Sequence, residues 1–259
     1  MYKMLVSDFY GTLINSEEAI SVSTMVEIDR IRNNGVYFCV TTENGVRIVK
    51  DYNKDFPFID YIIAFNGSYV FDLKKNRSLY SKCLGAVAIR KIFNLFKDME
   101  LCFYTLDYCY YTGSYCDDDF SLKLYGCVSD FIENNKKNIY KISICMNDMA
   151  SAKSIIKTIK DNNIKVVSYI VCDKGYFVVS VTNILDNKLS GLNVILNKLN
   201  IKLKEVLAVC SSLSSLDLIR KCGYGCVVSN GNEKLKNKAC EVTVSNEEKG
   251  VEQIIKKYF

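Results

Sequence analysis

The stretch Met4-Leu5-Val6-Ser7-Asp8-Phe9-Tyr10-Gly11-Thr12-Leu13 decides the fold. Its first four residues form a short apolar run that ends at Asp8, which predicts a buried strand, and Gly11 predicts a tight turn after it. Alternating patterns follow: a helix at 23–33 with Ser23 as its N-cap, a strand at 36–41, a helix at 44–52 and a strand at 61–65. Strands and helices that alternate with such short loops predict a parallel sheet with right-handed crossovers.

The pattern changes near Leu79 and returns at Lys188. Between these points we expect α+β structure with antiparallel pairing, including two aromatic-rich strands at 101–111, an acidic patch at 117–119 and a hairpin at 166–182. From Lys188 onward, helices and short apolar strands alternate again to the end of the sequence. The sequence therefore predicts one α/β domain, residues 1–81 and 184–259, that is split by an α+β insertion at 82–183.

Composition excludes several classes of function. The 259 residues include no His, and 34 Lys+Arg against 29 Asp+Glu give a net charge of +5. Without His the usual general base, the Ser-His and Cys-His pairs and the commonest zinc ligand are missing. The Lys residues are dispersed, which disfavours nucleic-acid binding, and no apolar run is long enough for a membrane span. The 12 Cys form no CxxC pair, so we expect reduced thiols in a cytoplasmic protein.

Polar residues follow the predicted strands of the α/β domain. Asp8 follows the first strand, Thr41-Thr42 the second and Asn66-Gly67 the third, and Lys188 comes just before a helix. In an open parallel sheet ligands bind at the carboxyl ends of the strands, so these groups can converge. A carboxylate, hydroxyls and an ammonium group suit a phosphoryl group. Each residue alone also has a plainer reading, as a turn residue, a helix cap or solvated surface.

These residues carry a resemblance to a known family. The chain resembles the haloacid dehalogenase (HAD) superfamily, in particular the Cof-type phosphatases of subfamily IIB, over essentially its whole length. The resemblance rests on Asp8–Leu13, Thr41-Thr42, Ile63–Ser68, Asn187-Lys188, Leu207–Cys210 and Ser245–Val251. It implies a Rossmann-like, doubly wound core with a cap inserted after the third strand, and Mg²⁺ as the family cofactor. It also implies Asp8 as the nucleophile that forms an aspartyl-phosphate, Thr42 and Lys188 as phosphoryl-binding groups, and Asn66 near the site.

Three positions depart from the family pattern. Tyr10 stands where family phosphatases have a general acid/base Asp, and a phenol with a pKa near 10 is a poor base at neutral pH. Ser211 and Ser215 stand where the turn after the fourth strand has two Mg²⁺-binding acids. Mg²⁺ requires hard, mostly charged oxygen ligands, and only Asp8 remains. Asp217 does not replace them, because on a helix it points about 200° away from Ser215.

The sequence leaves several functions open. One is a pseudoenzyme that retains binding of a phosphorylated small molecule through Thr41, Thr42, Asn66, Gly67, Ser211 and Ser212. A second is an active phosphohydrolase that acts through Asp8 and Lys188. A third is a metal-free, dehalogenase-like hydrolase, because dehalogenases also have Tyr at the position of Tyr10. The aromatic stretch 103–111 either binds a partner or lines the interface between cap and core.

Overall fold

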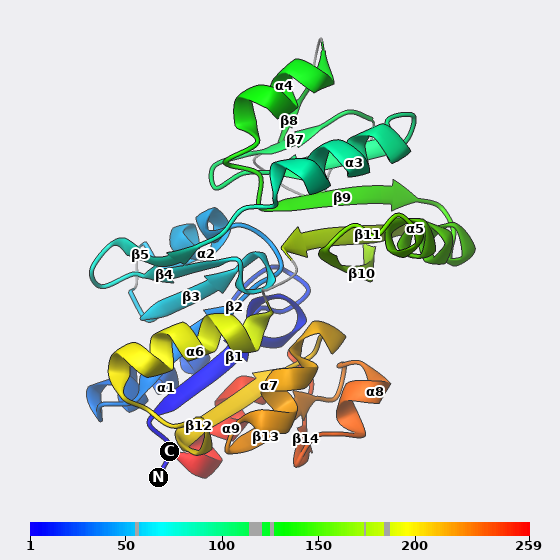
Figure 1. Cartoon of the computed structure of the whole chain (residues 1–259). Coiled ribbons are helices and arrows are strands. Elements are labelled where there is room, and N and C mark those ends of the chain that lie inside the picture. Colours follow the sequence, from blue (N-terminus) through cyan, green and yellow to red (C-terminus); the bar gives the residue numbers. More distant parts are fainter. Residues whose placement is uncertain (55–56, 114–120, 125–126, 174, 184–186) are drawn as a thin grey trace. The chain divides into compact units, whose positions relative to one another are not determined.

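The computed structural model describes residues 1–54, 57–113, 121–124, 127–173, 175–183 and 187–259. The chain divides into two compact units, of which the first comprises Met1–Ser81 with Asn187–Phe259 and the second comprises Lys82–Asp186. Figure 1 shows their elements along the chain. None of the described helices is long and apolar enough to cross a bilayer.

The first unit is built on an eight-stranded sheet in the order β14-β13-β12-β1-β2-β3-β4-β5. The strands are β1 (Met4–Asp8), β2 (Tyr37–Thr41), β3 (Tyr61–Ala64), β4 (Tyr69–Asp72), β5 (Arg77–Ser81), β12 (Val206–Cys210), β13 (Tyr224–Val228) and β14 (Glu241–Thr243). Neighbours from β14 to β3 pair in parallel, whereas β3–β4 and β4–β5 are antiparallel. The predicted α/β fold with a parallel core is confirmed, and β4 and β5 add an antiparallel edge that was not predicted.

Helices cover both faces of this sheet. They are α1 (Val22–Asn33), α2 (Val46–Tyr52), α6 (Lys188–Leu199), α7 (Leu216–Lys221), α8 (Glu233–Lys236) and α9 (Gly250–Tyr258), with short helical turns at Phe9–Leu13, Phe65–Gly67, Leu203–Glu205 and Leu213–Ser215. Figure 1 shows α6 and α7 in front of the sheet and α1 and α9 behind it. Alternate strand residues such as Met4 and Val6 pack with Leu192 and Ile195 of α6, whereas the intervening Leu5 is buried toward the other face.

The strand order reverses direction at β1. Successive strands extend from β1 through β2 to β3 on one side, and the chain returns to β12 on the other side of β1. The carboxyl ends of β1 and β12 therefore lie at a topological switch point, where open α/β sheets bind ligands.

The start of α6 packs closely against the turn after β3. Gly67 has φ +106°, and a Cβ there would lie 2.1 Å from the backbone oxygen of Asn187. Asn187 caps α6, because its side chain accepts a hydrogen bond from the backbone N–H of Ser190 at 2.8 Å. Gly67, which the sequence placed among the ligand-binding residues, thus has a packing role: it lets α6 begin where Lys188 reaches the strand ends.

The second unit has a six-stranded sheet in the order β10-β11-β9-β6-β7-β8. Its strands are β6 (Glu100–Tyr104), β7 (Cys109–Tyr111), β8 (Ser121–Lys123), β9 (Lys141–Met146), β10 (Val166–Asp173) and β11 (Tyr176–Asn183), and its helices are α3 (Ala86–Phe96), α4 (Val128–Asn135) and α5 (Met149–Asp161). Pairing is antiparallel except between β7 and β8. Apolar residues from all three helices pack on one face of the sheet. The predicted hairpin at 166–182 corresponds to β10 and β11, and the acidic patch at 117–119 lies outside the described residues.

Several local expectations need correction. Ser21, not Ser23, caps α1: its Oγ accepts from the N–H of Thr24 at 3.2 Å. Ser23 lies inside the helix and donates to Glu252 Oε2 at 2.6 Å, which ties α1 to α9. The aromatic stretch is used partly within its own unit, because Phe103 is fully buried and its ring centroid lies 5.8 Å from that of Phe131. Helix α4 was not predicted.

Candidate active site at the carboxyl end of the core sheet

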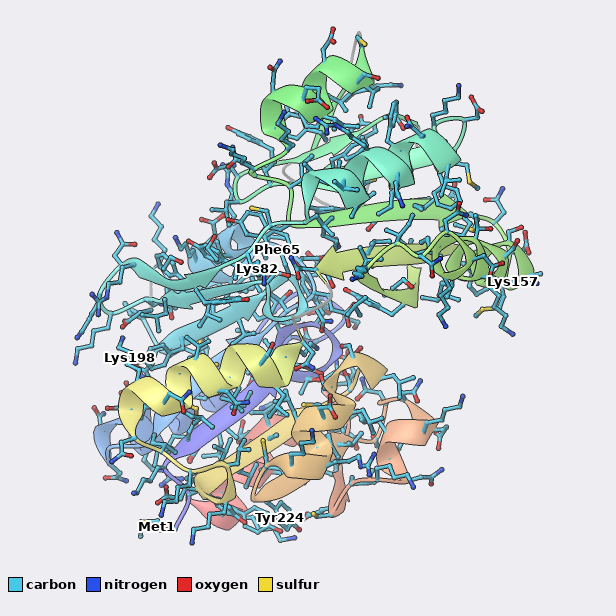
Figure 2. The ribbon with its side chains drawn as sticks, in the orientation of Figure 1. Met1, Phe65, Lys82, Lys157, Lys198 and Tyr224 are labelled. Atoms are coloured by element: carbon cyan, nitrogen blue, oxygen red, sulfur yellow. The ribbon has the colours of Figure 1, made fainter. Side chains whose placement is uncertain are left out.

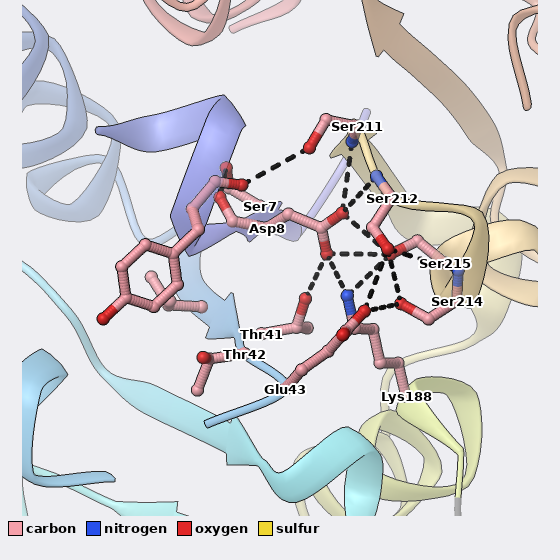
Figure 3. Close-up of polar contacts among 12 residues, drawn as sticks. Ser7, Asp8, Thr41, Thr42, Glu43, Lys188, Ser211, Ser212, Ser214 and Ser215 are labelled. Carbon is pink, nitrogen blue, oxygen red and sulfur yellow. Dashed lines mark hydrogen bonds and ion pairs between the residues drawn. The ribbon is translucent and has the colours of Figure 1, made fainter. Parts of the chain in front are cut away.

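Four segments of the first unit bring polar groups together beside Asp8. Asp8 is the last residue of β1 and Thr41 the last residue of β2, and their positions are paired across the two strands. Lys188 is the first residue of α6, and the turn that contains Ser211 and Ser215 follows β12. Figure 3 shows these side chains converging on one carboxylate. Asp8, Thr41 and Lys188 therefore meet at the carboxyl ends of the strands, where open α/β sheets bind ligands.

Both oxygens of Asp8 are surrounded by hydrogen-bond donors. Oδ1 accepts from Thr41 Oγ1 at 2.5 Å and from Lys188 Nζ at 2.8 Å. Oδ2 accepts from the backbone N–H groups of Ser211 at 3.1 Å and Ser212 at 3.3 Å. The hydroxyl of Ser215 lies 2.8 Å from both oxygens and accepts from Lys188 Nζ at 2.9 Å. Five donor groups thus face a carboxylate that offers about four lone-pair positions.

Asp8 and Lys188 form a buried ion pair, with side chains 3% and 2% exposed. Burial alone would raise the pKa of Asp8, but the charge of Lys188 and the hydrogen bonds from Lys188, Thr41 and Ser215 outweigh it and lower the pKa. Burial would likewise lower the pKa of Lys188, and the negative charges of Asp8 and Glu43 raise it. The carboxylate and the ammonium are therefore both charged at neutral pH.

A second network lies next to this pair. Glu43 follows β2 and its Oε1 accepts from the hydroxyls of Ser212 at 2.9 Å and Ser214 at 2.6 Å. The two hydroxyls are themselves 3.0 Å apart. Figure 3 shows the Glu43 carboxylate beside the serine turn and the end of Lys188. Glu43, Ser212 and Ser214 are partly exposed, whereas Asp8 and Lys188 are buried.

Other predicted site residues make different contacts. The side chain of Tyr10 is 37% exposed and its ring packs edge-on against Phe9. Thr42 Oγ1 accepts from the N–H of Asn44 at 3.0 Å, so Thr41, and not Thr42, donates to Asp8. Asn66 is buried in a left-handed conformation with φ 56°, and its Oδ1 has no hydrogen-bond partner among the described residues.

The residues beside Asp8 do not fit Mg²⁺. A magnesium ion requires oxygen lone pairs directed at it, usually from more than one carboxylate. Around Asp8 the lone pairs already face N–H and O–H donors. An acid at position 215 would bind a metal together with Asp8, whereas Ser215 donates a hydrogen bond to Asp8. Within the described ranges, no three His, Cys, Asp or Glu side chains cluster in a way that could hold a metal. Asp217 is turned to solvent near Lys221.

Sequence reasoning missed two members of the site, Glu43 and Ser214. Glu43 directly follows Thr41-Thr42 at the end of β2, so the strand-end rule could have included it. Ser214 lies between the two serines that were compared with family acids, but its contact with Glu43 joins segments 171 residues apart. Such a contact has no local signal in the sequence.

Comparisons with known proteins find relatives in sequence and in fold. A family model for haloacid dehalogenase-like hydrolases matches residues 5–255. The 5-amino-6-(5-phospho-D-ribitylamino)uracil phosphatase YitU of Bacillus subtilis is 22% identical, with 99% of this chain and 97% of the relative covered. A putative phosphatase of Haemophilus influenzae is 25% identical, with 100% and 99% covered.

Solved structures show the same fold. A haloacid dehalogenase-like hydrolase from B. subtilis superposes with a TM-score of 0.87 at 17% identity, covering 99% of this chain and all of the other. The HAD subclass IIB sugar phosphatase BT4131 gives a TM-score of 0.75 at 19% identity, with 99% and 98% covered. With the family model matched across nearly its whole length, the chain belongs to the haloacid dehalogenase-like hydrolases.

Proposed function

We propose that this chain is a phosphatase-like protein that binds a phosphorylated small molecule but has lost most of its phosphoryl-transfer activity. The observation that carries the proposal is the saturation of Asp8 by five donor groups. A nucleophilic oxygen needs a lone pair directed at phosphorus, and each hydrogen bond to Asp8 lowers the availability of such a pair. Relatives named as phosphatases support phosphorylated compounds as the class of ligand.

The position of Tyr10 supports the same proposal. Proton transfer to the leaving group requires a group with a pKa near the working pH. Tyr10 is only partly exposed and its ring packs on Phe9, and a phenol has a pKa of about 10. Without an efficient acid, an alkoxide leaving group departs slowly even if Asp8 attacks.

Binding groups persist beside the impaired nucleophile. Lys188 carries a positive charge held in place by Asp8 and Ser215, and the hydroxyl of Thr42 accepts from Asn44, which leaves its own hydrogen for a ligand oxygen. The hydroxyls of Ser212 and Ser214, at the partly exposed rim, already donate to Glu43. Lys188 and Thr42 are therefore the side chains suited to recognition of phosphoryl oxygens.

The rival function is a working phosphohydrolase. It is favoured by the ionised state of Asp8, which a nucleophile requires, and by the adjacent Lys188 charge. The two functions differ in whether an aspartyl-phosphate forms. A fluoroberyllate adduct at Asp8, or phosphate trapped on it, would support the rival and contradict the proposal.

Turnover of p-nitrophenyl phosphate with Mg²⁺ tests the proposal directly. We expect the wild-type rate to equal that of Asp8→Asn within error. A repaired variant, Tyr10→Asp with Ser211→Asp and Ser215→Asp, should gain Mg²⁺-dependent turnover, and Asp8→Asn in that background should abolish the gain. Robust wild-type turnover that Asp8→Asn removes would overturn the proposal.

A further inference from the structure

Glu43 contacts the serine turn after β12 and is not among the described groups that contact Asp8. One oxygen of Glu43 accepts from two hydroxyls, Ser212 at 2.9 Å and Ser214 at 2.6 Å. The contact with Ser214 has the length of a charge-assisted O–H···O⁻ bond, which is about twice as strong as a neutral one, and the contact with Ser212 has an ordinary hydrogen-bond length. Two donors converging on one oxygen is also how a protein holds an oxygen of a bound anion. Glu43 is therefore placed as a bound anion would be.

The charge of Glu43 reaches the buried pair. Burial lowers the pKa of Lys188. The negative charge of Asp8 raises that pKa, and the negative charge of Glu43 raises it to a smaller extent. Asp8, Glu43 and Lys188 together carry a net charge of −1. A doubly charged phosphate that approaches this cluster meets net repulsion, and two of the nearest hydroxyl donors are already occupied.

We propose that Glu43 is an internal anion that occupies the hydroxyl donors of Ser212 and Ser214 and thereby selects against doubly charged phosphate ligands. This inference rests on the proposed function, because it assumes that the site binds phosphoryl groups. It makes Glu43 a specificity-determining residue: a dianionic phosphoryl group must displace the Glu43 carboxylate, whereas a singly charged one meets less repulsion.

Calorimetric titration with inorganic phosphate at about pH 8, where phosphate is mostly dianionic, tests the inference. Glu43→Ala removes the charge and releases both hydroxyls, and we expect it to bind phosphate at least about tenfold more tightly than the wild type, a difference of about 1.4 kcal/mol. Glu43→Gln should show a smaller gain, because its amide oxygen still accepts from the serines. It also serves as the isosteric variant if Glu43→Ala folds poorly.

Two controls separate the cause of the gain. Glu17→Gln removes an exposed carboxylate elsewhere and should leave phosphate affinity unchanged, which excludes an effect of overall charge. Adding Ser212→Ala and Ser214→Ala to Glu43→Ala should cancel most of the gain, because the released donors are then absent. A cycle of wild type, Glu43→Ala, Ser212→Ala with Ser214→Ala, and the triple variant measures this coupling directly.

The outcomes separate this inference from the proposed function. Equal phosphate affinity in wild type and Glu43→Ala, or no binding by either, overturns the inference whatever the turnover rate is. A gain that is equally large without the two serine hydroxyls also overturns it, because removal of the Glu43 charge then accounts for the whole gain and donor occupancy for none of it. Phosphate binding that is measurable only in the Glu43 variants supports it. Rapid wild-type turnover would contradict the proposed function. The ratio of phosphate affinities between Glu43→Ala and wild type would still test the role of Glu43.

Discussion

Helix α6 carries a lysine at each end, and each lysine contacts a buried aspartate at the end of a strand. Lys188 at its start pairs with Asp8 of β1, and Lys198 near its end, labelled in Figure 2, contacts Asp72 of β4. Both aspartate side chains are almost fully buried, with exposures of 3% and 2%. The two pairs share a helix, a residue type and a degree of aspartate burial, so they form a natural comparison within one unit.

The two aspartates differ in how many donors they have. Asp72 accepts from Lys198 and from the backbone N–H of Lys75 at 2.9 Å, and Lys198 is a quarter exposed. Asp8 accepts from five donor groups, and its lysine is 2% exposed. At Asp72 the donor from α6 is Lys198, and the second donor comes from the turn after β4. The additional donors at Asp8 therefore indicate a site built around a negative charge. The comparison predicts that removing the carboxylate charge lowers the free energy of unfolding more at Asp8 than removing Lys198 does at Asp72.

The largest effect is expected for Asp8→Asn. The change leaves Lys188 charged and buried without its partner, and it turns an amide NH₂ toward groups that are themselves donors. Breaking a buried pair in this way costs about 3–5 kcal/mol of unfolding free energy. Urea denaturation followed by circular dichroism measures the loss. A stability equal to or above that of the wild type would show that the donors strain Asp8 instead of stabilising it.

A double-mutant cycle sharpens this result. Lys188→Met in the Asp8→Asn background removes the unpaired charge, so the double variant should lose less stability than the sum of the two single variants. We expect a coupling of about 1–3 kcal/mol. Additive losses would mean that the four remaining donors, and not Lys188, dominate the energetics of Asp8.

The sequence predicted Asp8 and Lys188 because each has a local signal. Asp8 ends a buried apolar run before a Gly turn, and Lys188 begins an amphipathic helix after Asn187. Thr41 and Thr42 were both named, but only Thr41 lies in β2, where its pairing with Asp8 of β1 places its hydroxyl beside the carboxylate. The Glu43 contact depends on packing between distant segments, which no local pattern encodes.

The fold, like the site, was predicted in part from local sequence patterns. Short apolar runs separated by amphipathic helices identified the parallel strands, because buried strands are nearly continuous in apolar residues. The edge strand β5 has mostly exposed residues and lacks that pattern, so the antiparallel extension was missed. Ser21 and Ser23 are both reasonable caps two residues apart, and the choice between them is made by the contact of Ser23 with Glu252.

A smaller effect is expected at the other end of α6. Lys198→Met removes one of the two donors to Asp72 and leaves the Lys75 N–H in place. Because Lys198 is partly solvated, we expect a loss of about 1–2 kcal/mol in urea denaturation, less than at Asp8. A loss as large as that of Asp8→Asn would show that donor number does not distinguish the two sites.

The pH dependence of stability tests the ionised state of Asp8. The pKa of Asp8 is lowered on folding, since the Lys188 charge and the hydrogen bonds to Asp8 outweigh burial, which alone would raise it. Its contribution is therefore fully present above the unfolded pKa of about 3.9 and is lost as pH falls through the folded pKa. The stability difference between wild type and Asp8→Asn should be constant from about pH 7 to 5 and shrink below about pH 4. A difference that stays constant down to pH 3 would contradict an ionised Asp8.

The smallest effect is expected where an ion pair is short but exposed. In the second unit Arg90 Nε lies 2.5 Å from Glu133 Oε1, as close as any contact at Asp8, yet both side chains are more than two-fifths exposed. Hydrogen bonds from Arg90 and Lys136 lower the pKa of Glu133 to about 2, but water screens the charges whether or not the pair forms. Glu133→Gln should therefore leave the urea midpoint unchanged within error. A clear decrease would mean that contact distance, and not burial with its number of donors, sets the energetic difference between Asp8 and the other carboxylates.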